Sequence, residues 1–273
     1  MLIPVLVLAT CAATGSIRTP AAAPADTLID VGDHRLHLEV IEGSASFAFV
    51  LEAGGGADMT SWATVPEALA ARTGATVVAY DRAGMGESEL GPSDLTPRAE
   101  IENLRVALAR LGVPSRRILV GTSYGALLAL WHAALHPEEI AGVLLVDPMN
   151  PGFVEATGDF VWSTVPTIDH AETDRERALV RLMSSFEDLI GEVDRVEPEI
   201  ERPIAVITAG KPWWGNEEAD AAWRRSHEEL AGGRSTRWLV VAEGSDHRVP
   251  ARRPDVIVET AARLLDVVEG GGT

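Results

Sequence analysis

The sequence contains only one cysteine, Cys11, among its 273 residues. A single cysteine excludes an intrachain disulfide and a zinc site made of several cysteines. A His-Glu-x-x-His pattern, or another histidine spacing typical of metal ligands, is also absent. The pair Gly84-x-Gly86 lacks the third glycine and the following helix of a dinucleotide-binding loop. The sequence therefore predicts no metal and no cofactor.

Basic residues are scarce. The chain has 23 lysines and arginines against 41 aspartates and glutamates, a formal net charge of −18. Such a charge repels phosphate backbones and anionic head groups. We therefore expect no nucleic-acid partner and no anionic substrate. The acidic residues are scattered along the chain, as on a solvated surface.

Internal repeats and apolar runs long enough to span a bilayer are missing too. Residues 2–13 are almost uniformly apolar, but a membrane-spanning helix needs about 20 such residues. Prolines and small residues follow at 20–25. We interpret residues 1–25 as a secretory leader cut after Ala23-Pro24-Ala25, although its positively charged start is missing. This interpretation predicts an exported protein.

Two alternatives for this segment stay open. Leu8-Ala9-Thr10-Cys11 resembles a bacterial lipoprotein box with a less usual threonine before the cysteine. In that case Cys11 is lipidated and tethers the protein to a membrane surface, the only membrane contact that we expect. In the other case the segment is a tail without a targeting role and the protein stays in the cytoplasm.

Apolar residues make up 46% of the chain, enough for one sizeable core. Alternating polarity predicts a hairpin over 28–31 and 36–40. Continuous apolar runs predict buried strands over 47–51, 75–80, 118–120, 143–146, 204–208 and 238–241. Helical spacing covers 62–72, 96–111, 126–131, 217–231 and 254–268. This alternation predicts an α/β fold, a mostly parallel sheet with helices on both faces.

The alternation of strands and helices stops between residues 149 and 203. Aromatic residues are scattered among charges there: Phe153, Phe160, Trp162 and Phe186. We interpret this segment as an inserted helical lid. The predicted organisation is a leader at 1–25, a core in two parts at 26–148 and 204–273, and the lid at 149–203.

The motif Gly121-Thr122-Ser123-Tyr124-Gly125 stands between the strand at 118–120 and the helical stretch that starts at Ala126. A Gly-x-Ser-x-Gly pattern between strand and helix is typical of a nucleophile elbow, in which the serine backbone is strained. Side chains at Gly121 and Gly125 would meet across the turn, so only glycine fits. Ser123 is therefore predicted at an exposed tip, with the amide of Tyr124 beside it.

Three candidate catalytic residues follow predicted strands: Ser123, Asp147 and His247. Because the carboxyl ends of parallel strands meet at one edge of a sheet, we expect these side chains to converge. Their order along the chain is the one found in α/β-hydrolases.

Several motifs together resemble the α/β-hydrolase fold superfamily over residues 28–268. They are Val50–Gly56 with Trp62 beyond it, Val78–Ser88, the elbow, and Gly244-Ser245-Asp246-His247. The resemblance implies that Ser123 is the nucleophile and His247 the general base. It also implies that the amides of Gly55 and Tyr124 form the oxyanion hole.

The sequence departs from the superfamily pattern in three places. Ala53 stands where histidine is common, and Asp246 replaces a frequent glycine. No carboxylate occurs in the segment 208–216, where the superfamily often has its triad acid. We therefore predict Asp147, one strand earlier, as in some lipases and haloalkane dehalogenases of the superfamily. The alternatives for the acid are Glu217, Glu218 and Asp220.

Other aromatic and imidazole side chains have less specific interpretations. Five histidines are expected to be structural: His34, His37, His132, His136 and His227. His170, in the predicted lid, is a candidate for substrate contact. Trp213 and Trp214 are expected either at the mouth of the pocket or over the edge of the sheet.

These residues predict a serine hydrolase that cleaves a carboxylic ester through an acyl-enzyme. A serine at the elbow favours acyl transfer, whereas an aspartate would favour epoxide or haloalkane chemistry. The aromatic lid favours an uncharged, moderately apolar small molecule as substrate. The alternatives are a lactonase, a thioesterase, a C–C bond hydrolase or an aminopeptidase with the same triad, and a non-catalytic binding protein. Nothing in the sequence indicates the oligomeric state.

Overall fold

The computed structural model of the chain describes residues 25–164 and 170–270. The predicted leader up to Pro24, with Cys11, lies outside the described residues, as does the side chain of Trp162. Among the described helices, none combines the length and the apolar character needed to cross a bilayer.

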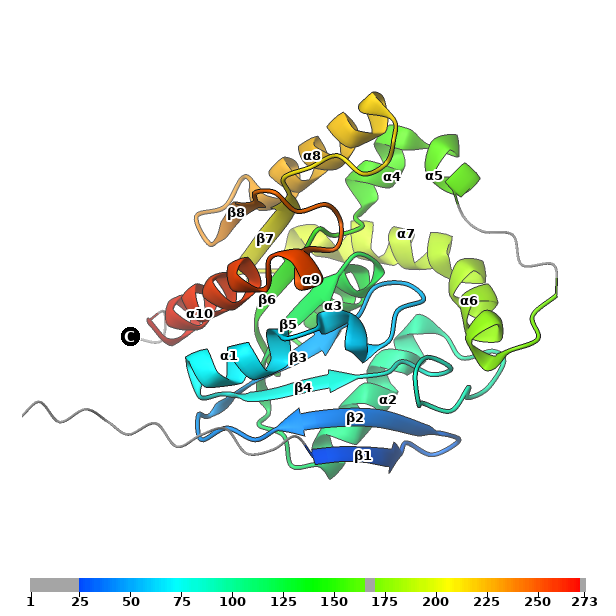
Figure 1. Cartoon of the computed structure of the whole chain (residues 1–273), viewed down its shortest axis with the longest axis vertical. Helices are drawn as coiled ribbons and strands as arrows, with labels where there is room; N and C mark the ends of the chain where they lie inside the picture. Colours follow the sequence, from blue (N-terminus) through cyan, green and yellow to red (C-terminus); the bar gives the residue numbers. More distant parts are fainter. Residues whose placement is uncertain (1–24, 165–169, 271–273) are drawn as a thin grey trace, which may run out of the picture.

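The described residues contain an eight-stranded sheet in the order β1-β2-β4-β3-β5-β6-β7-β8 (Figure 1). Its strands are β1 (Ala25–Asp30), β2 (Arg35–Ile41), β3 (Phe47–Glu52), β4 (Thr76–Tyr80), β5 (Arg116–Thr122), β6 (Ile140–Val146), β7 (Ile204–Ala209) and β8 (Arg237–Ala242). β1 and β2 form the predicted hairpin, and β2 runs antiparallel to β4. The remaining neighbours are parallel, so the carboxyl ends of β3 to β8 share one edge.

The central strands are buried on both faces, as their continuous apolar sequences predict. Every residue of β3, β4, β6 and β7 is buried, whereas the edge strand β1 is largely exposed. Covering both faces of the sheet requires helices on each side. The sheet therefore separates two apolar cores.

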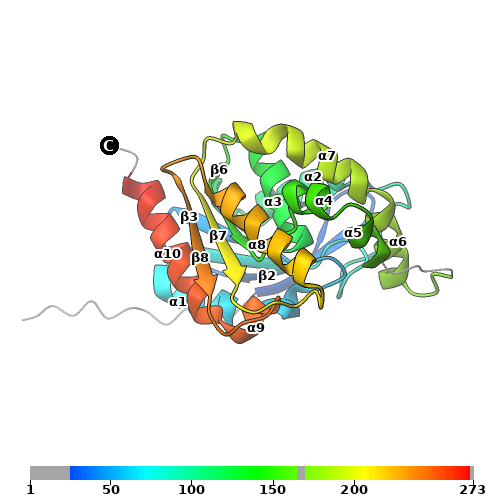
Figure 2. The ribbon, with the colours of Figure 1, turned by 90° about the horizontal axis from the view of Figure 1, so that it is seen from above.

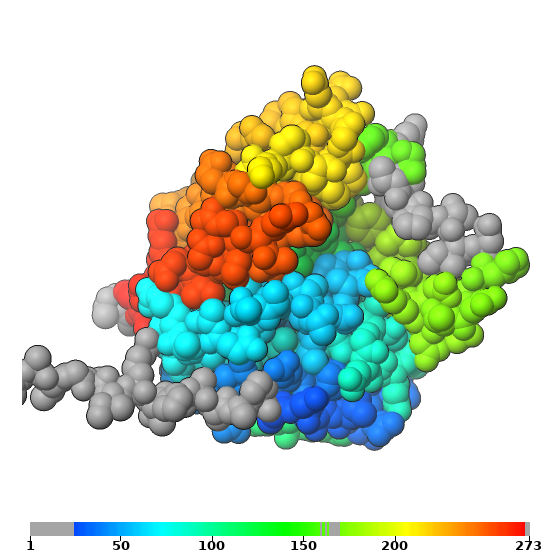
Figure 3. Space-filling view, viewed as in Figure 1, coloured from blue at the N-terminus to red at the C-terminus, as the bar shows by residue number. Residues whose placement is uncertain are grey.

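Helices α1 (Val65–Thr73), α9 (Val249–Arg252) and α10 (Pro254–Gly270) cover one face. They lie side by side on the side turned to the viewer in Figure 3. Helices α2 (Pro97–Arg110), α3 (Tyr124–Leu135) and α8 (Glu217–Ala231) cover the other face (Figure 2). The short helix α9 lies outside the predicted helix 254–268, and the 3₁₀ turn η1 (Met59–Trp62) ends where the predicted helix 62–72 begins.

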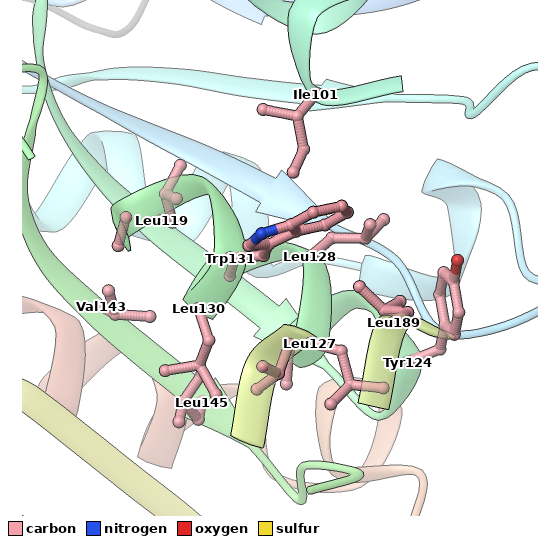
Figure 4. Close-up of a cluster of buried hydrophobic side chains, with 14 of the residues drawn as sticks. Ile101, Leu119, Tyr124, Leu127, Leu128, Leu130, Trp131, Val143, Leu145 and Leu189 are labelled. Carbon is pink, nitrogen blue, oxygen red and sulfur yellow. The ribbon is translucent and has the colours of Figure 1, made fainter. Parts of the chain in front are cut away.

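Helix α3 lies at the centre of the second core. Its side chains Leu127, Leu128 and Leu130 pack toward the sheet and toward Leu189 (Figure 4). The residues of α3 are buried from Tyr124 to Ala133, which explains why the helix is apolar on all sides. Packing along nearly the whole helix therefore fixes the position of α3, and with it the helix start directly after Ser123.

The predicted insertion between β6 and β7 is helical. It contains α4 (Pro151–Thr157), α5 (Asp159–Thr164), α6 (Asp174–Ser184), α7 (Phe186–Val196) and η2 (Glu197–Glu199). A capping box of Thr173 and Glu176 fixes the start of α6. Arg181 anchors α6 to the core by donating to the carbonyl oxygens of Leu90 (2.9 Å) and Ala83 (2.9 Å).

The contact between α3 and β3 generates a prediction about Gly125. A Cβ atom at this position would lie 2.2 Å from the carbonyl oxygen of Glu52. We expect Gly125→Ala to lower the free energy of unfolding by about 1–3 kcal/mol or more, measured by urea denaturation. Gly191, in α7, has nothing within 4 Å of its Cβ position. Gly191→Ala should therefore raise the free energy of unfolding by about 0.5–1 kcal/mol. Equal effects of the two substitutions would contradict this packing.

Candidate active site

Ser123 lies in a strained turn between β5 and α3. Its φ and ψ are 51° and −119°, a conformation that costs a residue with a side chain roughly 1–3 kcal/mol. Ala63, Ser123 and Asp147 are the non-glycine residues with positive φ in the described part of the chain. Two of these three are the predicted nucleophile and acid, so the strain coincides with the candidate site.

The two glycines of the elbow are required by close backbone contacts. A Cβ atom at Gly121 would lie 2.5 Å from the carbonyl oxygen of Gly125, across the turn. The expected contact across the turn is confirmed for a side chain at Gly121, whereas the nearest atoms to a Cβ at Gly125 belong to Glu52 and Ala53. The absence of a side chain at Gly125 thus allows α3 to lie close to the end of β3.

Asp147 follows β6 and is completely buried. Its Oδ2 is 2.7 Å from Nδ1 of His247. Its Oδ1 accepts from the amide of Ala209 (2.8 Å) and from Nε1 of Trp223 (3.0 Å). Burial alone would raise the pKa of this carboxyl, but the hydrogen bond and charge of His247, together with the other groups around the carboxylate, leave the pKa below its usual value. The acid therefore stays ionised beside the imidazole.

His247 lies in the loop between β8 and α9. The ring of Trp213 stacks on its imidazole, with 4.1 Å between centroids and 15° between planes. Its neighbour Asp246 pairs with Arg248 at 2.8 Å, and this hydrogen bond lowers the pKa of Asp246 to about 2. The unusual aspartate before the histidine therefore binds within its own loop and leaves Asp147 as the partner of His247.

Ser123, Asp147 and His247 follow β5, β6 and β8, at the same edge of the sheet. The amide of Ser123 donates to Val146 (3.2 Å), which ties the elbow to the residue before Asp147. Among the described residues, Ser123 Oγ forms no hydrogen bond to His247. Catalytic hydrogen bonds of this kind are often long or poorly aligned until substrate binds.

A second histidine, His227, lies beside the acid, with Nδ1 3.8 Å from Asp147 Oδ1. Its ring nitrogens are both engaged, with Thr208 Oγ1 (2.8 Å) and with the carbonyl oxygen of Pro148 (2.8 Å). Burial lowers its pKa, so the ring is neutral and donates to Pro148. His227 therefore supports the loop that carries Asp147 and has no nitrogen left for proton transfer.

The alternative acids lie elsewhere on α8. Asp220 accepts from the amides of Trp213 (2.9 Å) and Trp214 (3.0 Å). Glu217 and Glu218 are exposed in the first turn of the helix. Asp220 therefore fixes Trp214 and also Trp213, the ring that stacks on His247. None of the three carboxylates bonds to the imidazole within the described structure.

The loop after β3 lies against the elbow. A Cβ atom at Gly54 would lie 3.6 Å from Ser123 Cβ, and one at Gly55 would lie 3.4 Å from Tyr124 Cβ. The amides of Gly55 and Tyr124 donate to no other described residue. Both predicted oxyanion donors are therefore available on adjacent chain segments next to Ser123.

Two other histidines bind carboxylates of the protein, and a third is exposed. His37 lies between the carboxylates of Asp81 and Asp26, and His136 bonds to Glu102. His136, Glu138 and Glu139 offer atoms within 4.8 Å of one another, but Glu139 is paired with arginines. His170 is exposed in the described segment before α6.

Three contacts of the site could not be found from local sequence signals. Trp223 resembles any core residue of an amphipathic helix, yet it binds Asp147. The sequence predicts Trp213 either at the mouth of the pocket or over the edge of the sheet, and in the structure its ring stacks on His247. Arg82 is buried and binds the loop of Gly54 and Gly55.

Comparisons with solved structures show the same architecture. Proline iminopeptidase from Mycobacterium smegmatis has a TM-score of 0.64 at 17% identity, covering 91% of this chain and 100% of its own. Haloalkane dehalogenase DbeA from Bradyrhizobium elkani has a TM-score of 0.69 at 12% identity, covering 91% and 100%. At these identities the likeness shows the α/β-hydrolase fold and nothing beyond the fold.

The sequence itself supports the same class. Residues 49–272 match the model of the alpha/beta hydrolase family, and the chain belongs to this family. The uncharacterized protein YqjL of Bacillus subtilis (strain 168) is 23% identical over 223 residues, covering 81% of this chain and 84% of its own.

Proposed function

We propose that the protein is a serine hydrolase that cleaves a carboxylic ester through an acyl-enzyme. The observation that carries this proposal is a strained Ser123 at the sheet edge where the buried Asp147 lies 2.7 Å from the half-buried imidazole of His247. Ser123 Oγ attacks the ester carbonyl while His247 Nε2 takes its proton. The alcohol then leaves with that proton, and water releases the acid and restores Ser123.

The surroundings of the triad support both charged intermediates. The ionised Asp147 fixes the tautomer of His247 and stabilises the imidazolium that forms during attack. The tetrahedral intermediate carries its negative charge on oxygen, which the amides of Gly55 and Tyr124 are placed to bind. One such donor typically contributes about 3–4 kcal/mol to stabilisation of the transition state.

Aromatic side chains near the site support an uncharged, moderately apolar substrate. Trp213 and Trp214 are adjacent rings with centroids 4.1 Å apart, and Phe153 and Phe160 of the insertion contact Trp214. The overall charge of −18 disfavours anionic groups. Lactones, thioesters, C–C bonds and aminoacyl amides are alternatives on the same triad, which a panel of p-nitrophenyl esters against amino-acid anilides separates.

The proposal predicts covalent labelling of Ser123. A fluorophosphonate should modify one residue per chain, and peptide mass spectrometry should locate the adduct on Ser123. Ser123→Ala should abolish labelling and lower ester hydrolysis by roughly 10³-fold or more, with an unchanged melting temperature. A folded wild-type protein that stays unlabelled would refute a serine hydrolase.

The proposal also predicts different effects for two aspartates near His247. Asp147→Asn should lower kcat by roughly 10³–10⁴-fold, because the amide favours the wrong tautomer of His247. Asp220→Asn is the matched control, since asparagine keeps an oxygen for the amides of Trp213 and Trp214. We expect it to retain kcat within about threefold. The reverse pattern would transfer the role of the acid to Asp220.

A further inference from the structure

Arg82 is the second residue after β4 and is 3% exposed. Its Nη1 donates to the carbonyl oxygen of Ala53 and its Nη2 to that of Gly54, each at 2.5 Å. These carbonyls belong to the two residues just before Gly55. The guanidinium therefore holds the loop of the proposed oxyanion hole from behind.

The hydrogen bond from Arg82 to the carbonyl oxygen of Gly54 acts on a proposed oxyanion donor, the amide of Gly55. The carbonyl of Gly54 and the amide of Gly55 belong to one peptide unit, and a trans peptide points them in opposite directions. Fixing the oxygen of Gly54 therefore fixes the direction of the N–H of Gly55. A cation at this oxygen also polarises the peptide and makes the N–H a stronger donor.

The same guanidinium contacts the second donor residue. Its Cζ lies 5.3 Å from the ring centroid of Tyr124, within the range of a cation–π contact. Tyr124 carries the other proposed oxyanion amide and begins α3. One cation thus touches both segments whose amides must converge on the same oxygen.

Residues around Arg82 explain why a buried charge is tolerated there. Glu52, at the end of β3, accepts from the hydroxyl of Tyr80, and burial raises its pKa to about 7. Burial raises the pKa of Glu100 as well. The positive charge of Arg82 in turn lowers the pKa of both carboxyl groups. These acids therefore partly balance the charge of the guanidinium, while its hydrogen bonds go to carbonyl oxygens.

We propose that Arg82 is a positioning residue of the oxyanion hole, which orients and polarises the amide of Gly55 and aligns it with Tyr124. This inference rests on the proposed serine hydrolase function. A planar fork with two donors is required, because a lysine at this depth offers one nitrogen for two carbonyls. Its contribution should appear in the transition state rather than in substrate binding.

The test compares Arg82→Met and Arg82→Lys with the wild-type protein on a p-nitrophenyl ester. We expect Arg82→Met to lower kcat by roughly 10–100-fold with KM within threefold, and Arg82→Lys to lose roughly 3–10-fold. A trifluoromethyl ketone forms a tetrahedral adduct with the serine, so its Ki should rise by the same factor as kcat falls.

Arg175 supplies a matched control. Its guanidinium donates to the carbonyl oxygen of Gly56 at 2.8 Å, two peptides further along the same loop. The amide of that peptide belongs to Ala57 and already donates to Gly54 (3.2 Å), so it is not an oxyanion donor. Arg175→Met should therefore leave kcat and the Ki of the ketone within threefold.

Two results would overturn the inference. One is a folded Arg82→Met with kcat and Ki within threefold of the wild-type values. The other is a loss that appears in KM with an unchanged Ki. If Arg82→Met does not fold, Arg82→Lys decides, because it keeps the charge. Failure of fluorophosphonate labelling in the wild-type protein would instead refute the proposed function.

Discussion

The close approach of α3 to the end of β3 is the constraint on which the rest of the site depends. Gly125 lies so near the carbonyls of Glu52 and Ala53 that no side chain fits between them. This contact places the first turn of α3 beside the loop of Gly54 and Gly55, and so places Ser123 and the predicted donor Tyr124 next to the other predicted donor, Gly55. A wider separation would divide the nucleophile from the oxyanion hole.

Packing elsewhere stabilises the strained backbone at the site. Ser123 and Asp147 both have positive φ, each at a cost of roughly 1–3 kcal/mol. The buried helix α3 fixes the residue after Ser123. Asp147 is held by backbone and side-chain bonds from β7, α8 and the loop of His247. The strain is therefore surrounded by elements that have little freedom to relax it.

Much of the fold could be predicted because strand and helix periodicity is local. The continuous apolar run 47–51 gave β3 to within one residue, and the helix at 217–231 agrees with α8. The elbow was predicted because its five residues carry the whole signal. No local signal distinguishes Asp147 from Asp220 as the acid, because the distinction depends on a contact between positions 147 and 247.

Other features could not be predicted because they arise only from tertiary packing. Nothing near Arg82 in the sequence indicates that it reaches the carbonyls of Ala53 and Gly54. The stacking of Trp213 on His247 joins two loops after different strands. The exported or lipid-anchored location remains a prediction, because the leader lies outside the described residues.

In the proposed site, one hydroxyl and two amides converge on a single oxygen position. A crystal structure of the protein after reaction with an alkyl phosphonate would show this convergence. We expect phosphorus bonded to Ser123 Oγ and a phosphoryl oxygen roughly 2.7–3.1 Å from the amide nitrogens of both Gly55 and Tyr124. A phosphoryl oxygen that points away from both amides, or an adduct on another residue, would contradict it.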